Sequence, residues 1–596
     1  MSSALTVMPR HPALLICLLF GGISLGCRDD RDLVRQIQTQ RQLSIQASSR
    51  QDRLGDVTGL LRQFVDLNAD KAGEQISFQL NLWRSERADA KPDSQASEPA
   101  LPMDLLGNWS DLIPTPDIAA RIAQRDYIAS DTAWLRDAFL MAQVSDWADS
   151  SISDDPWLEA WFDSISGSPD GLAQPELEQL RVASRLFDWT IRNIALEPSG
   201  TPTPPYPTPS YPFGMTYGGP GYRQSVYQTL WRGSGDSLQR SQVFCQLCFQ
   251  AGIPSAILAM QDADGSRQPW SVGVLIDNQI YLFESALGLP IPGPDQTGIA
   301  TLSQARKDPA IMRRLDVAGY FDYPFSRMDI QQNVALMVVP PEAMAPRMKR
   351  LESSLTGDRR MRLHIDVSKL ANDLDSVPGI AGARLSELPL LSAIYQASNQ
   401  AFAARTPQFA VQHDARWRIV ELGSPMSDEL ARGRWRHLTG QFADEEMEGV
   451  DGARTLYLQQ RAPEFEIEDL RIDVDLQRAY GIRRDLGMSN EEFESAVMRI
   501  QNIMRLGKRT ATYWLSLIQY DDKRVETARN WFDRRVLDDK QRSMWTPAAW
   551  YNQARAEERL GNVEAAVALL KNDQSPAEHG NRLRARLIQK HLTQAN

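Results

Sequence analysis

Two cysteines three residues apart, Cys245 and Cys248, are the spacing in this sequence most suggestive of chemistry. A Cys-x-x-Cys motif supports thiol redox chemistry at the start of a helix, or supplies half of a zinc site. This pair lies two turns inside a predicted helix, and Cys248 falls on its apolar stripe, which favours core packing. The chain has four Cys and six His, with no second Cys pair and no His nearby. We therefore predict no metal, no cofactor and no redox-active thiol.

Nucleophilic catalysis needs a base beside the nucleophile, and this sequence places its bases far from the central segment 230–302. No His occurs between Cys27 and His364, and no Lys occurs between Lys91 and Lys307. Neither a Ser-His nor a Ser-Lys pair can therefore form inside the segment. The alternative that stays open pairs either cysteine with a distant histidine, namely His364, His413 or His437.

The elements that would position reactive side chains are read from periodicity in the same segment. Asp236 is the predicted N-cap of a helix that ends at Gly252-Ile253-Pro254. A helix followed by a buried strand and a hairpin is typical of an α+β fold. The predicted strands are 255–260, 270–276 and 279–283, with the hairpin turn at Asp277-Asn278.

Residues 178–302 resemble the core of the transglutaminase-like, papain-related superfamily. That family places a nucleophilic Cys at the N-terminus of such a helix, a His at the start of the next strand and an Asp at the end of the strand after it. The resemblance puts Ser237 in the nucleophile position and Glu284 in the carboxylate position, and the base position falls near Pro269 or Trp270. Of the three positions, only the carboxylate position, Glu284, keeps the type of side chain that the family has. The resemblance therefore implies a degenerate triad in which Ser237 serves as a helix-capping hydroxyl.

The N-terminus predicts export. A basic residue, Arg10, precedes the apolar stretch 13–20, and small residues lead to Cys27. Ser24-Leu25-Gly26-Cys27 resembles a bacterial lipobox, although Leu lies two rather than three residues before the Cys. The resemblance implies that residues 1–26 are removed and that Cys27 carries acyl chains as a membrane anchor. An ordinary cleaved signal or an uncleaved anchor is the alternative.

Composition narrows the class of protein further. The chain has 596 residues, of which 42% are hydrophobic and 24% charged, as in globular proteins. Its formal net charge of −11 disfavours nucleic acid as a partner. No later segment offers about 18 consecutive apolar residues, so we expect the remainder to lie outside the cytoplasm without a further membrane span.

A second, smaller α/β segment is predicted after the hairpin, at 325–384. Its pattern predicts a strand at 334–339, a helix from Glu342 to Leu355 and another strand at 361–367. A lone His on a strand, such as His364, is usually a structural residue.

The C-terminal residues 487–596 resemble tetratricopeptide repeats. Aromatic residues at 550–551, Gly561 at a turn and small residues at 565–568 suit two close-packed antiparallel helices. A weaker copy includes Ala528, which lies 38 residues before Ala566 against a period of 34. The resemblance implies a surface for a protein or peptide partner, with purely structural stacking as the alternative.

The sequence as a whole predicts a predominantly α-helical α+β protein. We expect a lipid-anchored cell-envelope protein, facing the periplasm or the exterior, that binds proteins or peptides through a non-catalytic transglutaminase-like module. Two alternatives stay open: a cysteine- or serine-type peptidase or acyltransferase acting on peptide amide bonds, and a structural envelope component whose modules only hold it in an assembly. The predicted divisions are a signal peptide (1–26), a helical segment (27–86), a linker (87–103), a helical region (104–197), a Pro-rich loop (198–222), the transglutaminase-like core (223–308, with helix 178–197), the small α/β segment (325–384), a helical segment (385–486) and the repeats (487–596).

Overall fold

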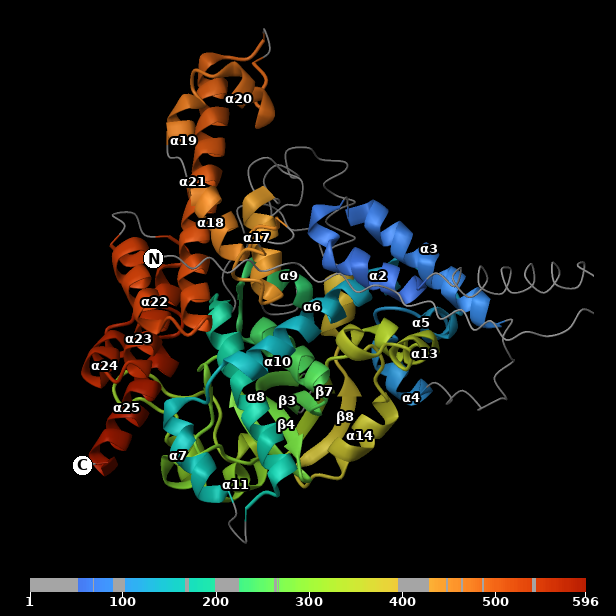
Figure 1. Ribbon diagram of the computed structural model, residues 1–596. Coiled ribbons are helices and arrows are strands. Elements are labelled where there is room, and N and C mark those ends of the chain that lie inside the picture. Colours follow the sequence, from blue (N-terminus) through green and yellow to red (C-terminus); the bar gives the residue numbers. More distant parts are fainter. Residues whose placement is uncertain are drawn as a thin grey trace, which may run out of the picture. The chain divides into compact units, whose positions relative to one another are not determined.

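The structure is a computed structural model, shown in Figure 1. By its internal contacts the chain divides after Arg53, and the elements below lie in the unit that begins at Leu54, apart from Arg53 itself at the start of the first helix. The predicted signal peptide, Cys27, His413 and nearly all of the Pro-rich loop lie outside the described residues. The described residues are 52–67, 69–88, 102–166, 171–198, 224–261, 265, 267–394, 428–445, 449–461, 465–484, 487–538 and 543–595.

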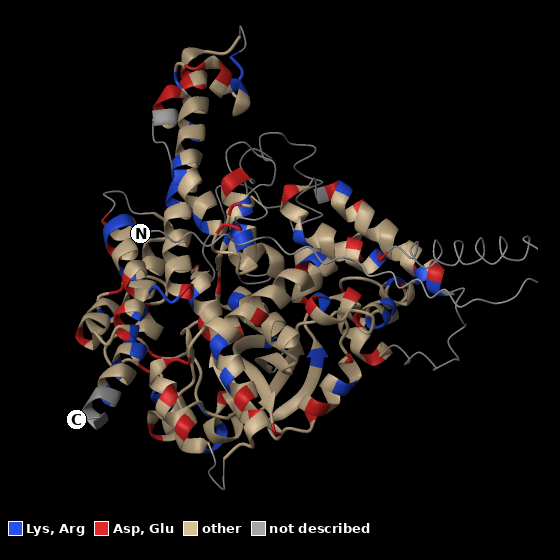
Figure 2. Cartoon of the chain, in the orientation of Figure 1, with Lys and Arg blue, Asp and Glu red and all other residues tan. Residues whose placement is uncertain are grey.

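A six-stranded sheet forms the centre of the α+β module, in the order β6-β5-β4-β3-β7-β8. Its strands pair antiparallel except for β7 and β8, which are parallel. Few charged residues lie on the central strands, in keeping with their burial (Figure 2). The strands are β3 (Ser255–Gln261), β4 (Arg267–Ile276), β5 (Gln279–Glu284), β6 (Leu289–Pro290), β7 (Asn333–Met337) and β8 (Ile380–Leu385).

The predicted hairpin is confirmed. Asp277 and Asn278 have φ values of 49° and 56°, the left-handed conformation that a two-residue hairpin turn requires at both central positions. Asn and Asp adopt this conformation more readily than other non-glycine residues. Ile276 pairs with Gln279 across the turn, so the register follows from local sequence.

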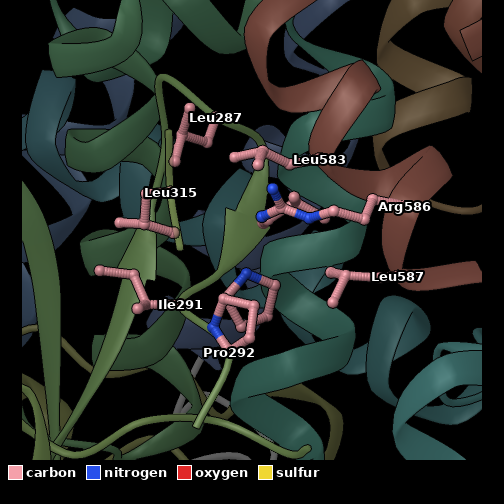
Figure 3. A pocket seen from close by; sticks show the side chains of 9 residues that line it. Leu287, Ile291, Pro292, Leu315, Leu583, Arg586 and Leu587 are labelled. Carbon is pink, nitrogen blue, oxygen red and sulfur yellow. The ribbon is translucent and has the colours of Figure 1, made fainter. Parts of the chain in front are cut away.

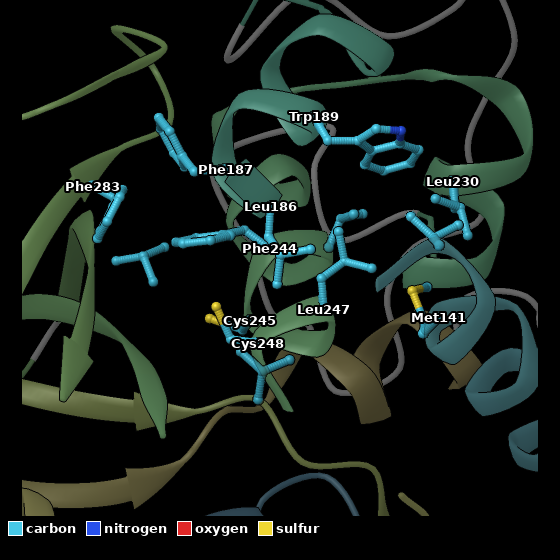
Figure 4. Close-up of a cluster of buried hydrophobic side chains, with 14 of the residues drawn as sticks. Met141, Leu186, Phe187, Trp189, Leu230, Phe244, Cys245, Leu247, Cys248 and Phe283 are labelled. Atoms are coloured by element: carbon cyan, nitrogen blue, oxygen red, sulfur yellow. The ribbon is translucent and has the colours of Figure 1, made fainter. Parts of the chain in front are cut away.

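Helix α10 (Ser237–Ala251) packs on the sheet and is bounded as predicted. The Asp236 carboxylate accepts from the Gln239 amide, while Gln239 reaches back to the Asp236 amide. Gly252 ends the helix with a φ of 77°. Apolar side chains of α10 form one core with α8 (Gln174–Asn193) and the sheet, including Phe187, Phe244 and Phe283 (Figure 4).

Helices before the module account for most of the described residues up to 198, as the periodicity predicts. Those in the predicted segment 27–86 and the region 104–197 are separated by residues 89–101, which lie outside the described part. A short parallel pair, β1 (Ala195–Leu196) and β2 (Ser234–Gly235), joins the end of α8 to the start of α10. The remaining helices are α2 (Arg53–Arg62), α3 (Ala69–Ala88), α4 (Met103–Leu106), α5 (Thr115–Ala123), α6 (Ala129–Ser151), α7 (Pro156–Ile165) and α9 (Val226–Arg232).

The predicted strand at 361–367 is wrong. The amides of Leu363 and His364 donate to the Glu352 carboxylate, so a side chain takes the place of a neighbouring strand. Asp366 then caps α14 (Val367–Asp375), and the strand that completes the sheet is β8. Between the module and this segment lie α11 (Leu302–Lys307) and α12 (Pro309–Arg313).

The helix predicted from Glu342 to Leu355 is shorter than expected. A 3-10 turn at Pro341–Met344 is followed by a separate helix, α13 (Pro346–Glu352). Pro346 has no amide hydrogen, so it begins a helix rather than continuing one.

Helices dominate the C-terminal part. Within the predicted helical segment 385–486, Leu385 belongs to β8 and residues 395–427 lie outside the described part. Consecutive helices from α21 onward pack against each other as hairpins. They are α17 (Asp428–Leu438), α18 (Ala453–Arg461), α19 (Phe465–Asp469), α20 (Val474–Ala479), α21 (Asn490–Asp521), α22 (Val525–Trp531), a π-helical turn (Phe532–Leu537), α23 (Thr546–Arg559), α24 (Val563–Lys571) and α25 (Glu578–Ala595).

The prediction of a predominantly helical α+β fold is confirmed. Of the helices in the described residues, none is both long and apolar enough to cross a membrane.

Candidate functional site

Ser237, the predicted nucleophile position, is the first residue of α10 and is half-buried. It does not cap the helix, since the neighbouring Asp236 carboxylate does. The Ser237 carbonyl accepts from the Ser241 hydroxyl, which also lies 2.9 Å from the Ser285 hydroxyl. The expected capping role of Ser237 is therefore wrong.

Trp270, in the base position, is buried and structural. Its indole nitrogen donates to the Asn333 side chain at 2.9 Å, and its ring packs 6.4 Å from that of Phe325. Strand β4 bulges at this point, because Leu258 pairs with Ser271 while Ala259 pairs with Pro269. Trp270 is thus the extra residue of a β-bulge, and its indole has no basic nitrogen.

Glu284, in the carboxylate position, is buried and accepts from the Tyr323 hydroxyl and from the Ala286 amide at 2.9 Å. Burial raises the pKa of Glu284 to about 7, although these two hydrogen bonds oppose the rise. The preceding Phe283 packs against Phe244 of α10. Because side chains alternate along a strand, Glu284 points to the face of the sheet away from α10.

The three positions do not form a triad. Among the described residues, no hydrogen bond joins any two of Ser237, Trp270 and Glu284. Two of them are committed to other partners, and Glu284 faces away from the helix that carries Ser237. Tyr323 and Phe325 pack together between Glu284 and Trp270.

Cys245 and Cys248 pack in the core, as predicted. Both thiols are free and buried, and their sulfurs lie among apolar side chains of α10 (Figure 4). Burial raises the pKa of Cys245 to about 12 and that of Cys248 well above its usual value. Neither thiol is activated.

We expect native protein near neutral pH to leave both cysteines unmodified by iodoacetamide, because burial blocks access and disfavours the thiolate. Peptide mapping by mass spectrometry before and after unfolding measures this. An Ala565→Cys variant, exposed on α24, is the positive control. Modification of Cys245 or Cys248 in folded protein would contradict the prediction and favour a thiol enzyme.

His437, one of the distant histidines, serves other contacts. His437 lies 3.3 Å from the Tyr457 hydroxyl through Nδ1 and 3.9 Å from the Asp521 carboxylate through Nε2. Burial lowers the pKa of His437 to about 4, so the imidazole is neutral at pH 7. This arrangement of Tyr, His and Asp is a further candidate that sequence reasoning missed. All three side chains are buried, which closes it to a substrate.

A histidine outside the predicted set reaches the module. His579, at the start of α25, places Nε2 2.7 Å from the Leu315 carbonyl and stacks on Phe321. Its ring also meets Tyr323 edge-on, and Tyr323 holds Glu284. The sequence gives no sign of these contacts, because His579 and Leu315, for example, are 264 residues apart.

Two small cavities lie where the module meets the C-terminal helices. The first, of about 10 Å³, is walled by Leu583, Arg586 and Leu587 of α25 against Leu287 of the module and Leu315 just after it (Figure 3). Gly580 permits this packing, because a Cβ there would lie 1.8 Å from the Leu287 carbonyl oxygen. The apolar lining of this cavity offers little for recognition.

The second cavity, of about 20 Å³, is the more informative. Arg240, one turn after Ser237, lines it together with residues of α23 and of the segment 575–581. Sequence reasoning missed Arg240, because an arginine on a surface helix normally faces solvent. Its burial in the first turns of α10 places a positive charge beside the degenerate triad position.

Ion pairs fix the C-terminal helices to α8. Asp188 binds Arg192 on its own helix and Arg555 of α23, and Arg192 also binds Asp521 of α21 at 2.6 Å. Asp155 accepts from Arg584 of α25 at 2.7 Å. All six side chains are buried, so the helices are docked on the module through their charged inner faces.

Comparison with protein-family models gives no match to this chain. Comparisons with curated proteins and with solved structures give no match either. Within the described residues no group of three or more His, Cys, Asp or Glu is placed to hold a metal ion.

Proposed function

We propose that this protein is a lipid-anchored component of the cell envelope whose transglutaminase-like module binds a protein or peptide without turning it over. One observation supports this proposal: the three triad positions do not come together. Within the described residues no hydrogen bond joins any two of Ser237, Trp270 and Glu284, and Glu284 faces away from α10, the helix that carries Ser237. Among the described residues no hydrogen bond joins Ser237 to a base, and Glu284 is bound to Tyr323 on the opposite face of the sheet.

The meeting of the module with residues 487–596 supports peptide binding at their junction. The cavity lined by Arg240 has its other wall on α23 and on the segment before α25, so both predicted binding regions contribute to it. A second surface lies on the helices around the start of α21. There Ile472, Val474 and Met498 are 80%, 54% and 51% exposed.

Incubating the purified chain with a mixed peptide library distinguishes binding from turnover. We expect recovered peptides to have unchanged masses, with a subset retained by the protein. New cleavage or transfer products that disappear in a Ser237→Ala variant of intact fold would contradict the proposal. Such products are the expected result for a peptidase or acyltransferase.

The enzymatic alternative has one observation in its favour. Glu284 is a buried carboxyl whose pKa, raised by burial to about 7, suits a general acid or base. In a Glu284→Gln variant, loss of library turnover while Ser237→Ala remains active would identify chemistry centred on Glu284. If neither the wild type nor either variant turns over any peptide, the result supports the binding function.

Anchoring is tested separately. Cys27→Ser removes the residue that the lipobox resemblance assigns to acylation, so we expect the protein to move from the membrane fraction to the soluble fraction. Immunoblotting of fractionated cells measures this, with Cys17→Ser in the predicted signal as the matched control. Unchanged membrane association of the Cys27 variant would contradict the proposed anchor.

A further inference from the structure

Arg240 is a buried cation whose hydrogen bonds within the described residues all go to main-chain carbonyls. Its side chain is almost fully enclosed, with 4% of the residue surface exposed. Nε and Nη2 donate to the Ile194 carbonyl at 2.8 and 2.6 Å, whereas Nη1 has a weaker contact to the Ser285 carbonyl at 3.4 Å. The nitrogen with the weakest partner is therefore Nη1.

The charge of Arg240 lacks the carboxylate counter-ion that most other buried arginines have. Within the described residues, Arg240 forms no ion pair with a carboxylate, whereas the following buried arginines do: Arg192, Arg232, Arg347, Arg555 and Arg584. Arg434 also lacks an ion pair, but it lies 4.5 Å from the Trp514 ring and near Asp521. Burial lowers the pKa of Arg240 to about 10, with only the phenols of Tyr551 and Tyr513 opposing it. An unpaired buried charge is costly, and a bound anion would offset that cost.

The space beside Arg240 is small and reaches solvent. The cavity of about 20 Å³ holds roughly one water-sized group. Gly288 borders it with a φ of 63°, and a Cβ there would lie 3.9 Å from Nη1 of Arg240. Ala548 and Ala577 form the opposite wall with Tyr551. Small residues thus border this space on both sides, beside the guanidinium.

We propose that this cavity binds a carboxylate group of a peptide, with one carboxylate oxygen in the deep end facing Arg240. The inference rests on the proposed peptide-binding function and names the chemistry of the ligand. A single guanidinium in a water-sized space suits a carboxylate better than a phosphate, which would bring further charged oxygens. The carboxylate belongs either to the C-terminus of a peptide or to an Asp or Glu side chain.

Thermal unfolding of the full chain in sodium acetate, at constant ionic strength, tests the site itself. Removing Arg240 would also take its donors from the carbonyls of Ile191, Ile194 and Ser285. The variant of choice is therefore Ala577→Leu, which fills the cavity and leaves Arg240 in place. Ala565→Leu, on the exposed face of α24, is the matched control. We expect acetate to raise Tm saturably by roughly 2 °C in the wild type and the control, and not in Ala577→Leu.

An equal response in all three proteins, or no response in any, would overturn the anion site. Peptide-binding measurements then identify the source of the carboxylate. Short acetylated peptides are compared with a free C-terminus, with an amidated C-terminus, and with an amidated C-terminus plus one internal Asp. Binding of only the first supports a C-terminal carboxylate, and binding of the third supports a side chain. Acetate binding without binding of any peptide overturns the peptide assignment and the proposed function, while leaving the anion site established.

Discussion

Replacing Asp188 with asparagine is expected to lower the free energy of unfolding by about 3–5 kcal/mol, the usual cost of breaking a buried ion pair from one side. Burial opposes ionisation of Asp188, but the guanidiniums of Arg555 and Arg192 outweigh it and hold the pKa of Asp188 below its usual range. Asparagine keeps the shape of the side chain and removes the charge, which leaves both arginines short of a counter-ion. Urea denaturation followed by tryptophan fluorescence measures the change.

The matched control is Glu159→Gln on α7. Its carboxylate lies 3.2 Å from Arg559, but the two side chains are 50% and 23% exposed. Exposed pairs contribute about 0–1 kcal/mol, so this variant should be close to wild type. If Asp188→Asn were as mild as the control, the buried ion pairs would not be what fixes the C-terminal helices to the module.

Replacing Glu284 with glutamine is expected to change how stability depends on pH. In the folded chain burial raises the pKa of Glu284 to about 7, above the ordinary value of 4.5. The folded state therefore keeps its proton where the unfolded state has lost it, and stability is lost as pH rises from 4.5 to 7. At about 1.4 kcal/mol per pKa unit, the loss at pH 8 is on the order of 3 kcal/mol. Glutamine does not titrate, so the variant should lack this component.

Urea denaturation of wild type and Glu284→Gln at pH 4, 6 and 8 isolates this component as the difference between the two proteins. Relative to the variant, wild type should become less stable as pH rises. A Tyr323→Phe variant sharpens the test, because the Tyr323 hydroxyl lowers the pKa of Glu284. Removing this hydroxyl should raise the pKa of Glu284 further, so the loss of stability should extend to higher pH. Parallel pH profiles for wild type and Glu284→Gln would show that Glu284 does not titrate in this range.

Local signals in the sequence predicted the parts of the fold that depend on neighbours along the chain. The cap at Asp236 and the hairpin turn at Asp277-Asn278 are of this kind, since each is decided by a few adjacent residues. The strand predicted at 361–367 failed because the Glu352 carboxylate, about ten residues away, binds the main-chain amides that a strand would need.

The candidate site was less predictable for the same reason. The sequence shows that Ser237 has no neighbouring base, but it does not show that Glu284 points away from α10. Nor does it show that α25 brings His579 against Tyr323, or that Arg240 is buried without a carboxylate. These features depend on packing between segments that are tens to hundreds of residues apart, for which the chain carries no periodic signal.

Helix α21 connects two separate hydrophobic clusters of the molecule. Its 32 residues extend about 48 Å at 1.5 Å per residue. The first half packs with α19 and α20 in a small hydrophobic cluster of its own, and the second half enters the main core and ends at Asp521. A partner that binds the exposed side chains near Met498 would thus contact one end of a continuous helix whose other end forms an ion pair with α8 through Asp521 and Arg192.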